Sequence, residues 1–197
     1  MYIRQVKATE LAELLQLINS NVIDPVRIAD KDYISKLSSE GFLVGKLHED
    51  EIKRMLDRIF LVVTSKQRII GYLRIDEEID VDFKELDMQG MVDWVHTDFK
   101  KYYYQLPHYE IGGVLVTKEF SRKNIGASLL YKAMEMLKYK NLKYLFSFVP
   151  VSPVRNEPSL KFHLKNGFKV IAKLQPLELW GMKHYQSVLL MKESEWV

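Results

Sequence analysis

The sequence predicts a mixed α/β domain, in which strands alternate with helices along the chain. Two segments, Glu10–Asn19 and Asn124–Tyr139, carry apolar residues at the spacing of an amphipathic helix. Short runs rich in apolar and β-branched residues, such as Phe60–Thr64 and Ile69–Ile75, are typical of strands. The length of 197 residues and the hydrophobic content of 47% suit one globular domain over residues 1–197.

The first half of the chain is expected to open with a strand at Tyr2–Val6 and an amphipathic helix. Thr9 is the predicted N-cap of this helix, whose apolar stripe contains Leu11, Leu14, Leu15 and Ile18. Two further short helices are expected near Lys31–Ser38 and Glu49–Ile59. The strands Phe60–Thr64 and Ile69–Ile75 read as a β-hairpin, because only a short polar segment joins them.

The second half alternates strand and helix more clearly. Strands are expected at Tyr109–Thr117, Tyr144–Val149, Phe168–Lys173 and Tyr185–Met191. Pro150 and Pro153 should end the second of these strands, because proline has no backbone donor. Pro158 suits the first turn of a helix that stops before Gly167.

Composition excludes several classes of protein. The chain has no cysteine, so it has no disulfide, thiolate metal site or cysteine nucleophile, and a reducing cytoplasm is compatible with it. No apolar run reaches the roughly 18 residues of a membrane span. Charged residues within Met1–Glu13 are unlike a signal peptide, and a net charge of +3 is too weak to indicate nucleic-acid binding.

The charge is concentrated in one segment. Asp76–Lys100 holds nine acidic and two basic residues, a net charge of −7, which leaves +10 on the rest of the chain. We expect an acidic and aromatic insertion at about residues 76–108, with Trp94, Phe99 and Tyr102–Tyr104 beside the acids. Two interpretations stay open: a solvated insertion whose aromatic residues pack on the sheet, or a wall that attracts a cationic substrate.

One motif predicts a binding site for a polyanion. Gly113–Leu130 reads as a strand, a short basic loop and a helix that opens with small residues. The backbone N–H groups and the dipole of a helix start favour a pyrophosphate there. Gly126 lets the backbone approach the ligand closely, and Arg122 and Lys123 add positive charge. An ordinary strand–loop–helix connection with solvated bases is the alternative.

A second motif follows about 30 residues later. In Asn156–Phe168, the asparagine stands just before a short helix, and Gly167 ends the helix before the next strand. Ser159, Phe162 and His163 project from one side of this helix, because they are three and four residues apart.

Together, in this order, the two motifs resemble those of the GNAT family, the Gcn5-related N-acetyltransferases. Val116, Gly126 and, in the second motif, five residues match the family pattern: Asn156, Phe162, Lys165, Gly167 and Phe168. Four positions depart from it: Ser121 stands for Gln or Arg, Asn124 for glycine, Ser159 for alanine and His163 for tyrosine. Arg122 could supply the missing charge, and asparagine adopts a left-handed backbone readily.

The resemblance covers Phe60–Met191 and implies the GNAT fold, with a mixed, mostly antiparallel sheet flanked by helices. In that fold the fourth and fifth strands splay apart and acyl-CoA lies between them. The implied cofactor-binding residues are the strand backbone at Leu115 and Val116, and the loop and helix start at Ser121, Arg122, Lys123, Asn124, Ile125, Gly126 and Ala127. Asn156, Ser159 and Phe162 would lie along the pantetheine arm.

The resemblance also implies which residues catalyse transfer. Glu110 begins the fourth strand, where family members often place the carboxylate base, and His108 is a second candidate base. His163 occupies the place of the usual tyrosine acid, and it would protonate or hydrogen-bond the leaving thiolate. The alternatives are a surface glutamate at the strand edge and a buried histidine without a proton-transfer role. Tyr109 and Tyr185 could supply a further hydroxyl.

We therefore expect an enzyme that transfers an acetyl group from acetyl-CoA to a primary amine, by direct attack on the thioester. The acceptor would be a small cationic molecule or a peptide amine at an N-terminus or lysine, and the Trp180–Gly181 turn would face the acceptor channel. The alternatives are transfer of longer acyl chains from CoA or an acyl carrier protein, and a non-catalytic acyl-CoA-binding or regulatory module. We expect no metal, nucleic acid or membrane partner, a cytoplasmic location, and compatibility with a homodimer.

Overall fold

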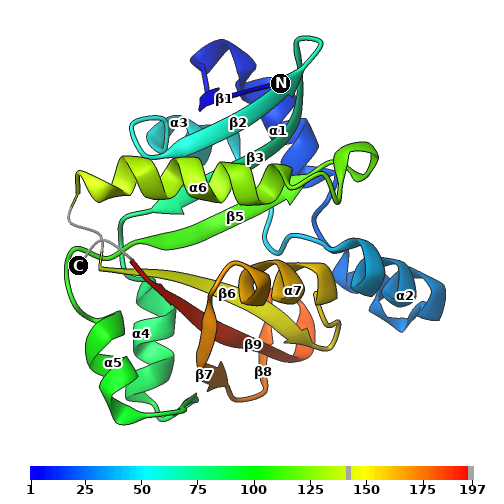
Figure 1. The fold of residues 1–197 in the computed structure, drawn as a ribbon. Helices are drawn as coiled ribbons and strands as arrows, with labels where there is room; N and C mark the ends of the chain where they lie inside the picture. The colour runs from blue at the N-terminus through cyan, green and yellow to red at the C-terminus, as the bar shows by residue number, and fades with distance from the viewer. Residues whose placement is uncertain (141–142, 195–197) are drawn as a thin grey trace. The chain divides into compact units, whose positions relative to one another are not determined.

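The computed structural model describes residues 1–140 and 143–194. It confirms a mixed α/β fold whose strands form a nine-stranded sheet in the order β1-β2-β3-β5-β6-β9-β7-β4, with β8 paired to β9 (Figure 1). The strands are β1 (Tyr2–Gln5), β2 (Phe60–Ser65), β3 (Arg68–Asp76), β4 (Val92–Trp94), β5 (Glu110–Val116), β6 (Tyr144–Ser152), β7 (Lys169–Leu174), β8 (Leu177–Leu179) and β9 (Met182–Glu193).

The helices lie between these strands along the chain. They are α1 (Leu11–Asn19), α2 (Lys31–Glu40), α3 (Glu49–Arg54), α4 (Val81–Met88), α5 (Thr97–Tyr103), α6 (Ile125–Lys138) and α7 (Glu157–Lys165). Three short 3₁₀ helices are η1 (Ala8–Glu10), η2 (Pro25–Ala29) and η3 (Lys118–Phe120). No described helix has the length and apolar character needed to cross a membrane.

The chain divides into two compact units. The first contains Met1–Val22, Leu43–Asp76 and Ile111–Leu142. The second contains Ile23–Phe42, Glu77–Glu110 and Lys143–Val197. The first unit therefore holds the predicted pyrophosphate loop, and the second holds Glu110 and α7.

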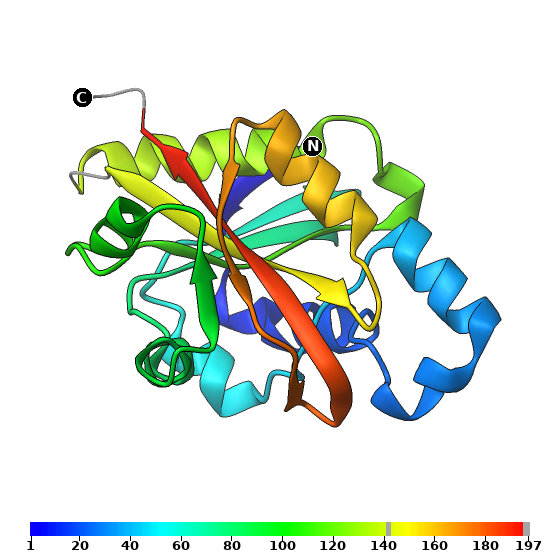
Figure 2. The same cartoon turned by 90° about the horizontal axis from the view of Figure 1, so that it is seen from below.

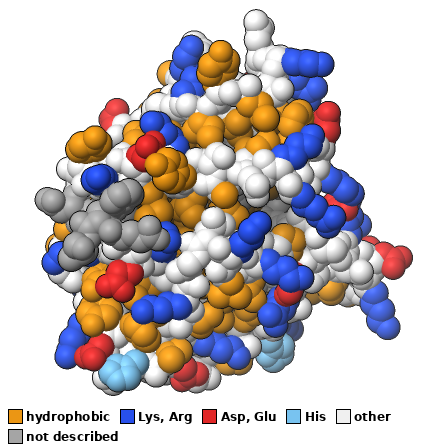
Figure 3. Space-filling model, in the orientation of Figure 1, with side chains coloured by type: hydrophobic (Ala, Val, Ile, Leu, Met, Phe, Trp, Pro, Cys, Tyr) orange, Lys and Arg blue, Asp and Glu red, His pale blue; other side chains and the backbone are white. Residues whose placement is uncertain are grey.

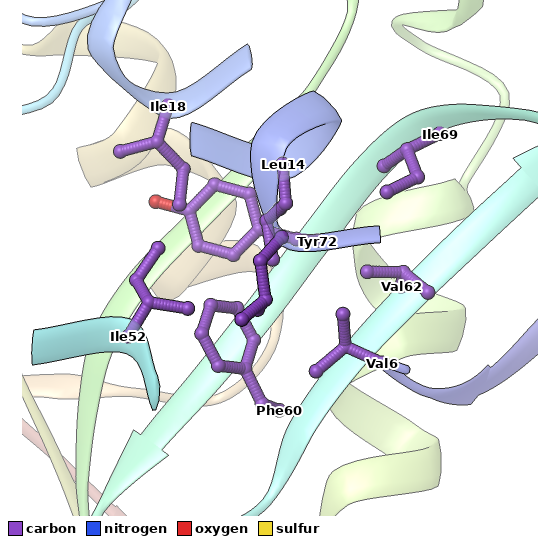
Figure 4. Close-up of a cluster of buried hydrophobic side chains, with 9 residues drawn as sticks. Val6, Leu14, Ile18, Ile52, Phe60, Val62, Ile69 and Tyr72 are labelled. Atoms are coloured by element: carbon purple, nitrogen blue, oxygen red, sulfur yellow. The ribbon is translucent and has the colours of Figure 1, made fainter. Parts of the chain in front are cut away.

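The first unit has a hydrophobic core between helix α1 and strands β2 and β3. The predicted stripe of α1 supplies Leu11, Leu14 and Ile18, which are buried in one cluster with Phe60 and Tyr72. Figure 4 shows Leu14 and Ile18 of this cluster with the two rings. Burial of each such side chain stabilises the fold by about 1.5–3 kcal/mol. The predicted cap of this helix is wrong: the chain enters α1 through η1, and it is the Glu10 carboxylate that accepts a hydrogen bond, from the backbone N–H of Lys7.

The predicted hairpin of β2 and β3 is confirmed. Lys66 and Gln67 form its two-residue turn with φ values of 48° and 65°. Two consecutive residues with positive φ make the turn type that matches the right-handed twist of paired strands. A Gly-containing turn is more usual, so the two strands and the short polar segment between them, rather than a turn motif, predict this hairpin.

The second unit is built on β6, β9, β7 and β4, all paired antiparallel (Figure 2). The predicted end of β6 at Val149 is wrong, because the strand continues through Pro150 to Ser152. Its register with β9 shifts between Pro150 and Ser152, and a strand interior accommodates a proline at such an irregularity. The first residue of β5, Glu110, pairs in parallel with Phe146 of β6, and the separation expected of these strands beyond that pair stays a prediction.

The acidic segment is ordered into α4, β4 and α5. Tyr103 of α5 is fully buried and packs its ring against Phe83 of α4, Phe146 and Phe148 of β6. The packing interpretation of the aromatic cluster is therefore confirmed for Tyr103. These elements were missed in the sequence because their apolar residues are few and lie between acids.

Candidate active site

The loop that follows β5 has the backbone of an anion-binding turn. Arg122 and Asn124 both adopt left-handed conformations, with φ of 61° and 59°, which confirms the conformation expected of Asn124. The backbone N–H of Ser128 donates to the Asn124 carbonyl and makes the first helical bond of α6. The N–H groups of Ile125, Gly126 and Ala127 precede that bond, so the start of α6 presents donors to an anion.

The charges of this loop suit the same ligand. Arg122 and Lys123 are exposed, and Figure 3 shows Lys and Arg side chains at the surface around the start of α6. The Lys123 ammonium lies 4.9 Å from the centre of the Phe120 ring. The Ser121 hydroxyl donates to the Lys118 carbonyl, so it stabilises the loop. The loop residues therefore fit a pyrophosphate in charge and in backbone conformation.

Strand β5 approaches its neighbour closely at two glycines. A Cβ atom on Gly113 would lie 2.6 Å from the Tyr72 hydroxyl, and one on Gly112 would overlap Asp76 and Arg74. Arg74 donates to the Gly112 carbonyl at 3.0 Å and to the Asp76 carboxylate at 2.9 Å. These contacts fix the backbone of β5 ahead of Leu115 and Val116. No local pattern in the sequence predicts them.

In the second unit, the two candidate bases lie side by side. His108 Nε2 is 3.7 Å from Glu110 Oε2, and the His108 ring is almost completely buried. The ring stacks on Phe146 with a centroid distance of 5.1 Å and an interplanar angle of 6°. The spacing could have revealed this proximity, because residues two apart at a strand entry share one face of the sheet.

Asn156 acts as the N-cap of α7. Its Oδ1 accepts from the Ser159 backbone N–H at 3.3 Å, and its Nδ2 donates to the Phe42 carbonyl at 2.7 Å. The side chain is buried, so these bonds tie α7 to the end of the segment that carries α2. A contact of Asn156 with pantetheine stays a prediction.

His163 lies in an apolar environment on α7. Its ring is 1% exposed and meets the edges of Phe162 and Phe168. Burial lowers its pKa to about 4, although Nδ1 lies 2.7 Å from the Ser159 carbonyl. The imidazole is therefore neutral near pH 7, with its proton on Nδ1 and a lone pair on Nε2. A lone pair accepts a proton and does not donate one, so in this neutral state Nε2 is a hydrogen-bond acceptor, and the acid role of His163 stays a prediction.

The burial of His163 should make stability depend on pH. Its pKa is lowered from 6.5 in the unfolded chain to about 4, so the unfolded state binds the proton first. The stabilisation is complete above pH 6.5 and is lost as the pH falls to 4, a change of up to about 3 kcal/mol. We expect urea unfolding of His163→Phe to show a flatter dependence between pH 6.5 and 4.5. His96→Gln, at an exposed histidine, should retain the wild-type slope, and equal slopes in all three proteins would contradict this reading.

One acidic residue of the insertion has a structural role. Asp87 is buried and accepts hydrogen bonds from Trp94 Nε1 at 2.9 Å and the Tyr104 hydroxyl at 2.8 Å, and its Oδ2 lies 3.0 Å from Lys100 Nζ. Burial acts to raise the pKa of Asp87, but these three partners outweigh it and lower the pKa. Asp87 therefore holds α4, β4 and α5 together.

We expect Asp87→Ala to destabilise the protein by about 2–3 kcal/mol, because it leaves buried donors without an acceptor. The free energy of unfolding, measured in urea, checks this. Asp82→Ala is the matched control, since Asp82 is an exposed carboxylate on the same helix. Equal effects of the two substitutions would contradict a structural role for Asp87.

The remaining predicted hydroxyls are buried. Tyr109 and Tyr185 are each 4% exposed, and burial raises the pKa of both phenols. The Tyr185 hydroxyl is engaged by the Ser187 side chain. Trp180, in the turn between β8 and β9, is half exposed and meets the Tyr185 ring edge-on. Among the described residues, no three His, Asp or Glu side chains are arranged to hold a metal ion.

Comparison with known families decides the classification. The sequence pattern of the acetyltransferase (GNAT) family matches residues 27–168. The chain belongs to the GNAT acetyltransferase family. This membership confirms the resemblance carried by the two motifs, including the motif in which Ser121 and Asn124 depart from the usual residues. No curated protein sequence matches the chain significantly.

Solved structures share this GNAT fold at low sequence identity. NAA60 of Arabidopsis thaliana, in complex with a bisubstrate analogue, has a TM-score of 0.67 and 10% identity, covering 100% of this chain and 99% of its own. The ribosomal-protein-S18-alanine N-acetyltransferase of Escherichia coli has 0.60 and 10%, covering 98% and 92%. The PaiA N-acetyltransferase of Thermoplasma acidophilum, in complex with coenzyme A, has 0.56 and 16%, covering 98% of both chains.

Proposed function

We propose that this GNAT protein transfers an acetyl group from acetyl-CoA to a primary amine. The observation that carries the proposal is the loop before α6, where left-handed Arg122 and Asn124 and the open N–H groups of the first turn suit a pyrophosphate. The CoA complex of the similar PaiA structure supports the same donor. Leu115 and Val116 would pair with pantetheine through their backbone, and Asn156, Ser159 and Phe162 would line its arm.

The chemistry requires a group that removes a proton from the acceptor ammonium. Glu110 is the proposed base, because its carboxylate is largely buried beside His108 and belongs to the first residue of β5. The amine nitrogen then attacks the thioester carbonyl carbon, and the sulfur leaves as CoA thiolate. A backbone N–H of β5 would stabilise the developing oxyanion.

The proposed acceptor is a peptide N-terminus or a small cationic amine. Exposed or partly exposed carboxylates at the start of α4 and in the segment that leads into it, such as Glu77, Glu78 and Asp82, favour a cation. The similar E. coli enzyme is named for acetylating a ribosomal-protein alanine, which supports a protein acceptor. The cysteine-free sequence suits a reducing compartment, so the reaction is proposed for the cytoplasm.

Release of free CoA thiol tests the proposal. The full chain is incubated with acetyl-CoA and a panel of amines that includes peptides with a free N-terminus, blocked peptides with one lysine, and small polyamines. We expect thiol release that depends on one amine class. Thiol release only with longer acyl-CoA donors would contradict acetyl transfer and would show that the protein transfers a larger acyl group.

A non-catalytic acyl-CoA-binding module is the second candidate. The neutral, buried state of His163 favours it, because the usual tyrosine acid then has no equivalent at that position. Binding of acetyl-CoA without thiol release for any amine would support this candidate and contradict the first.

A further inference from the structure

We propose that His108 and Glu110 form a proton-sharing pair, in which His108 orients the Glu110 carboxyl and accepts a hydrogen bond from it once it has taken the acceptor's proton. The inference rests on the proposed function for its role in catalysis. The pair itself rests on geometry within the second unit. His108 is a positioning residue in this scheme, because Glu110 receives the proton from the amine.

The first step of the argument is the tautomer of His108. Its Nδ1 lies 2.9 Å from the Tyr103 backbone carbonyl, which only accepts hydrogen bonds. Nδ1 therefore carries the proton in the neutral ring, and Nε2 offers a lone pair. Nε2 has no hydrogen-bond partner among the described residues, and Glu110 Oε2 lies 3.7 Å away. A small rotation of the Glu110 side chain would bring the two atoms into hydrogen-bond range.

The second step is that the ring is held in place. His108 stacks on Phe146, and the Tyr103 ring meets it edge-on at 4.8 Å. Glu110 is fixed on the same side, because it pairs in register with Phe146 and the Phe146 N–H donates to the Tyr109 carbonyl. The unpartnered nitrogen is thus directed toward Glu110 by packing from α5 and β6, and it cannot swing to solvent.

The third step is the charge around the pair. Tyr103 faces it from α5, and burial raises the pKa of that phenol, so Tyr103 stays neutral. The charges of Asp80 and Tyr104 also raise the pKa of Tyr103, and the charge of Glu77 raises the pKa of Tyr109. The carboxylates of Asp80 and Glu77 therefore add negative charge to this part of the second unit.

The proton balance is then simple. The acceptor R–NH₃⁺ gives one proton to a Glu110 oxygen and becomes R–NH₂, whose lone pair attacks the thioester carbonyl carbon. As the C–S bond breaks, the nitrogen loses a second proton, which the departing CoA thiolate takes up, so that the products are the amide and CoA thiol. The new O–H of Glu110 donates to His108 Nε2, so the proton is shared between oxygen and nitrogen. It returns to water after the amide and CoA have left.

The direct test follows the His108 ring by NMR titration of the full chain, without donor or acceptor. In Glu110→Gln, we expect His108 to take up its proton at a lower pH than in the wild-type protein, because an opposite charge is lost. Glu85→Gln removes an exposed carboxylate and should leave the titration unchanged. An equal His108 midpoint in wild type and Glu110→Gln would overturn the pair.

The second test uses the rate. In His108→Asn, the asparagine amide can still donate to the Tyr103 carbonyl, but the side chain has no atom in the place of Nε2. We expect kcat to fall about tenfold or more, the KM for acetyl-CoA to change less than about twofold, and the acidic limb of kcat/KM to move to lower pH. A purely structural effect would lower the rate equally at every pH, and an unmoved midpoint would overturn the role. If no amine is acetylated, the proposed function fails while the NMR titration still decides the pair.

Discussion

Glu110→Gln should lower kcat by about 10²–10⁴-fold, because it removes the only base proposed for the acceptor ammonium. Glutamine keeps the size of the side chain, and the pairing of Glu110 with Phe146 in the sheet is between backbones, so this pairing should persist. Thiol release with the best amine of the panel measures the effect. The affinity for acetyl-CoA should stay within about twofold of wild type, since the base is assigned to the acceptor rather than the donor.

The control for this substitution is Glu85→Gln, which removes the same charge from an exposed position on α4. It separates loss of the base from a general loss of negative charge in the acidic segment. Raising the pH should partly restore the rate of Glu110→Gln, because more of the amine is then unprotonated. A variant that turns over at the wild-type rate would remove Glu110 from the mechanism and leave the identity of the base open.

Gly126→Trp should weaken acetyl-CoA binding by about 100-fold or more, a loss of about 2.7 kcal/mol. Gly126 is the second residue of α6, where a large side chain would cover the N–H groups proposed to hold the pyrophosphate. Equilibrium binding measured by calorimetry, with acetyl-CoA and with free CoA, gives the size of the effect.

Ser128→Trp is the matched control, because it places the same side chain on an exposed position of the same helical turn. Circular dichroism of both variants should show intact α6. If Gly126→Trp binds acetyl-CoA as tightly as Ser128→Trp does, the loop is not the pyrophosphate site.

The sequence was sufficient for the fold wherever a local pattern decided the structure. The stripe of α1, the hairpin of β2 and β3, and the helices α6 and α7 follow from spacing and end signals, and the structure has each of them. The prediction that the prolines end β6 at Val149 is wrong, because pairing with β9 on one side outweighs the lost donor of Pro150. The elements α4, β4 and α5 depend on tertiary contacts such as those of Asp87, which no local pattern reveals.

The candidate site likewise has features that the sequence predicts and features that it does not. The conformation of Asn124 and the cap formed by Asn156 depend on neighbouring residues, and the sequence predicted both positions. The chemistry of His163 and His108 depends on burial and on carbonyl groups distant from the motif pattern. Burial keeps the His163 imidazole neutral, and the fold places the two candidate bases, His108 and Glu110, beside each other.

The central claim is that this GNAT protein binds acetyl-CoA as its donor, and thermal unfolding of the full chain with and without the ligand tests it most directly. A ligand that binds only the native state stabilises it by about 2.7 kcal/mol at a hundredfold excess over Kd. We predict a clear rise in Tm with acetyl-CoA and with free CoA, and a much smaller rise in Gly126→Trp at the same concentrations. An unchanged Tm of the wild-type protein with acetyl-CoA, free CoA and longer acyl-CoA donors would contradict the claim.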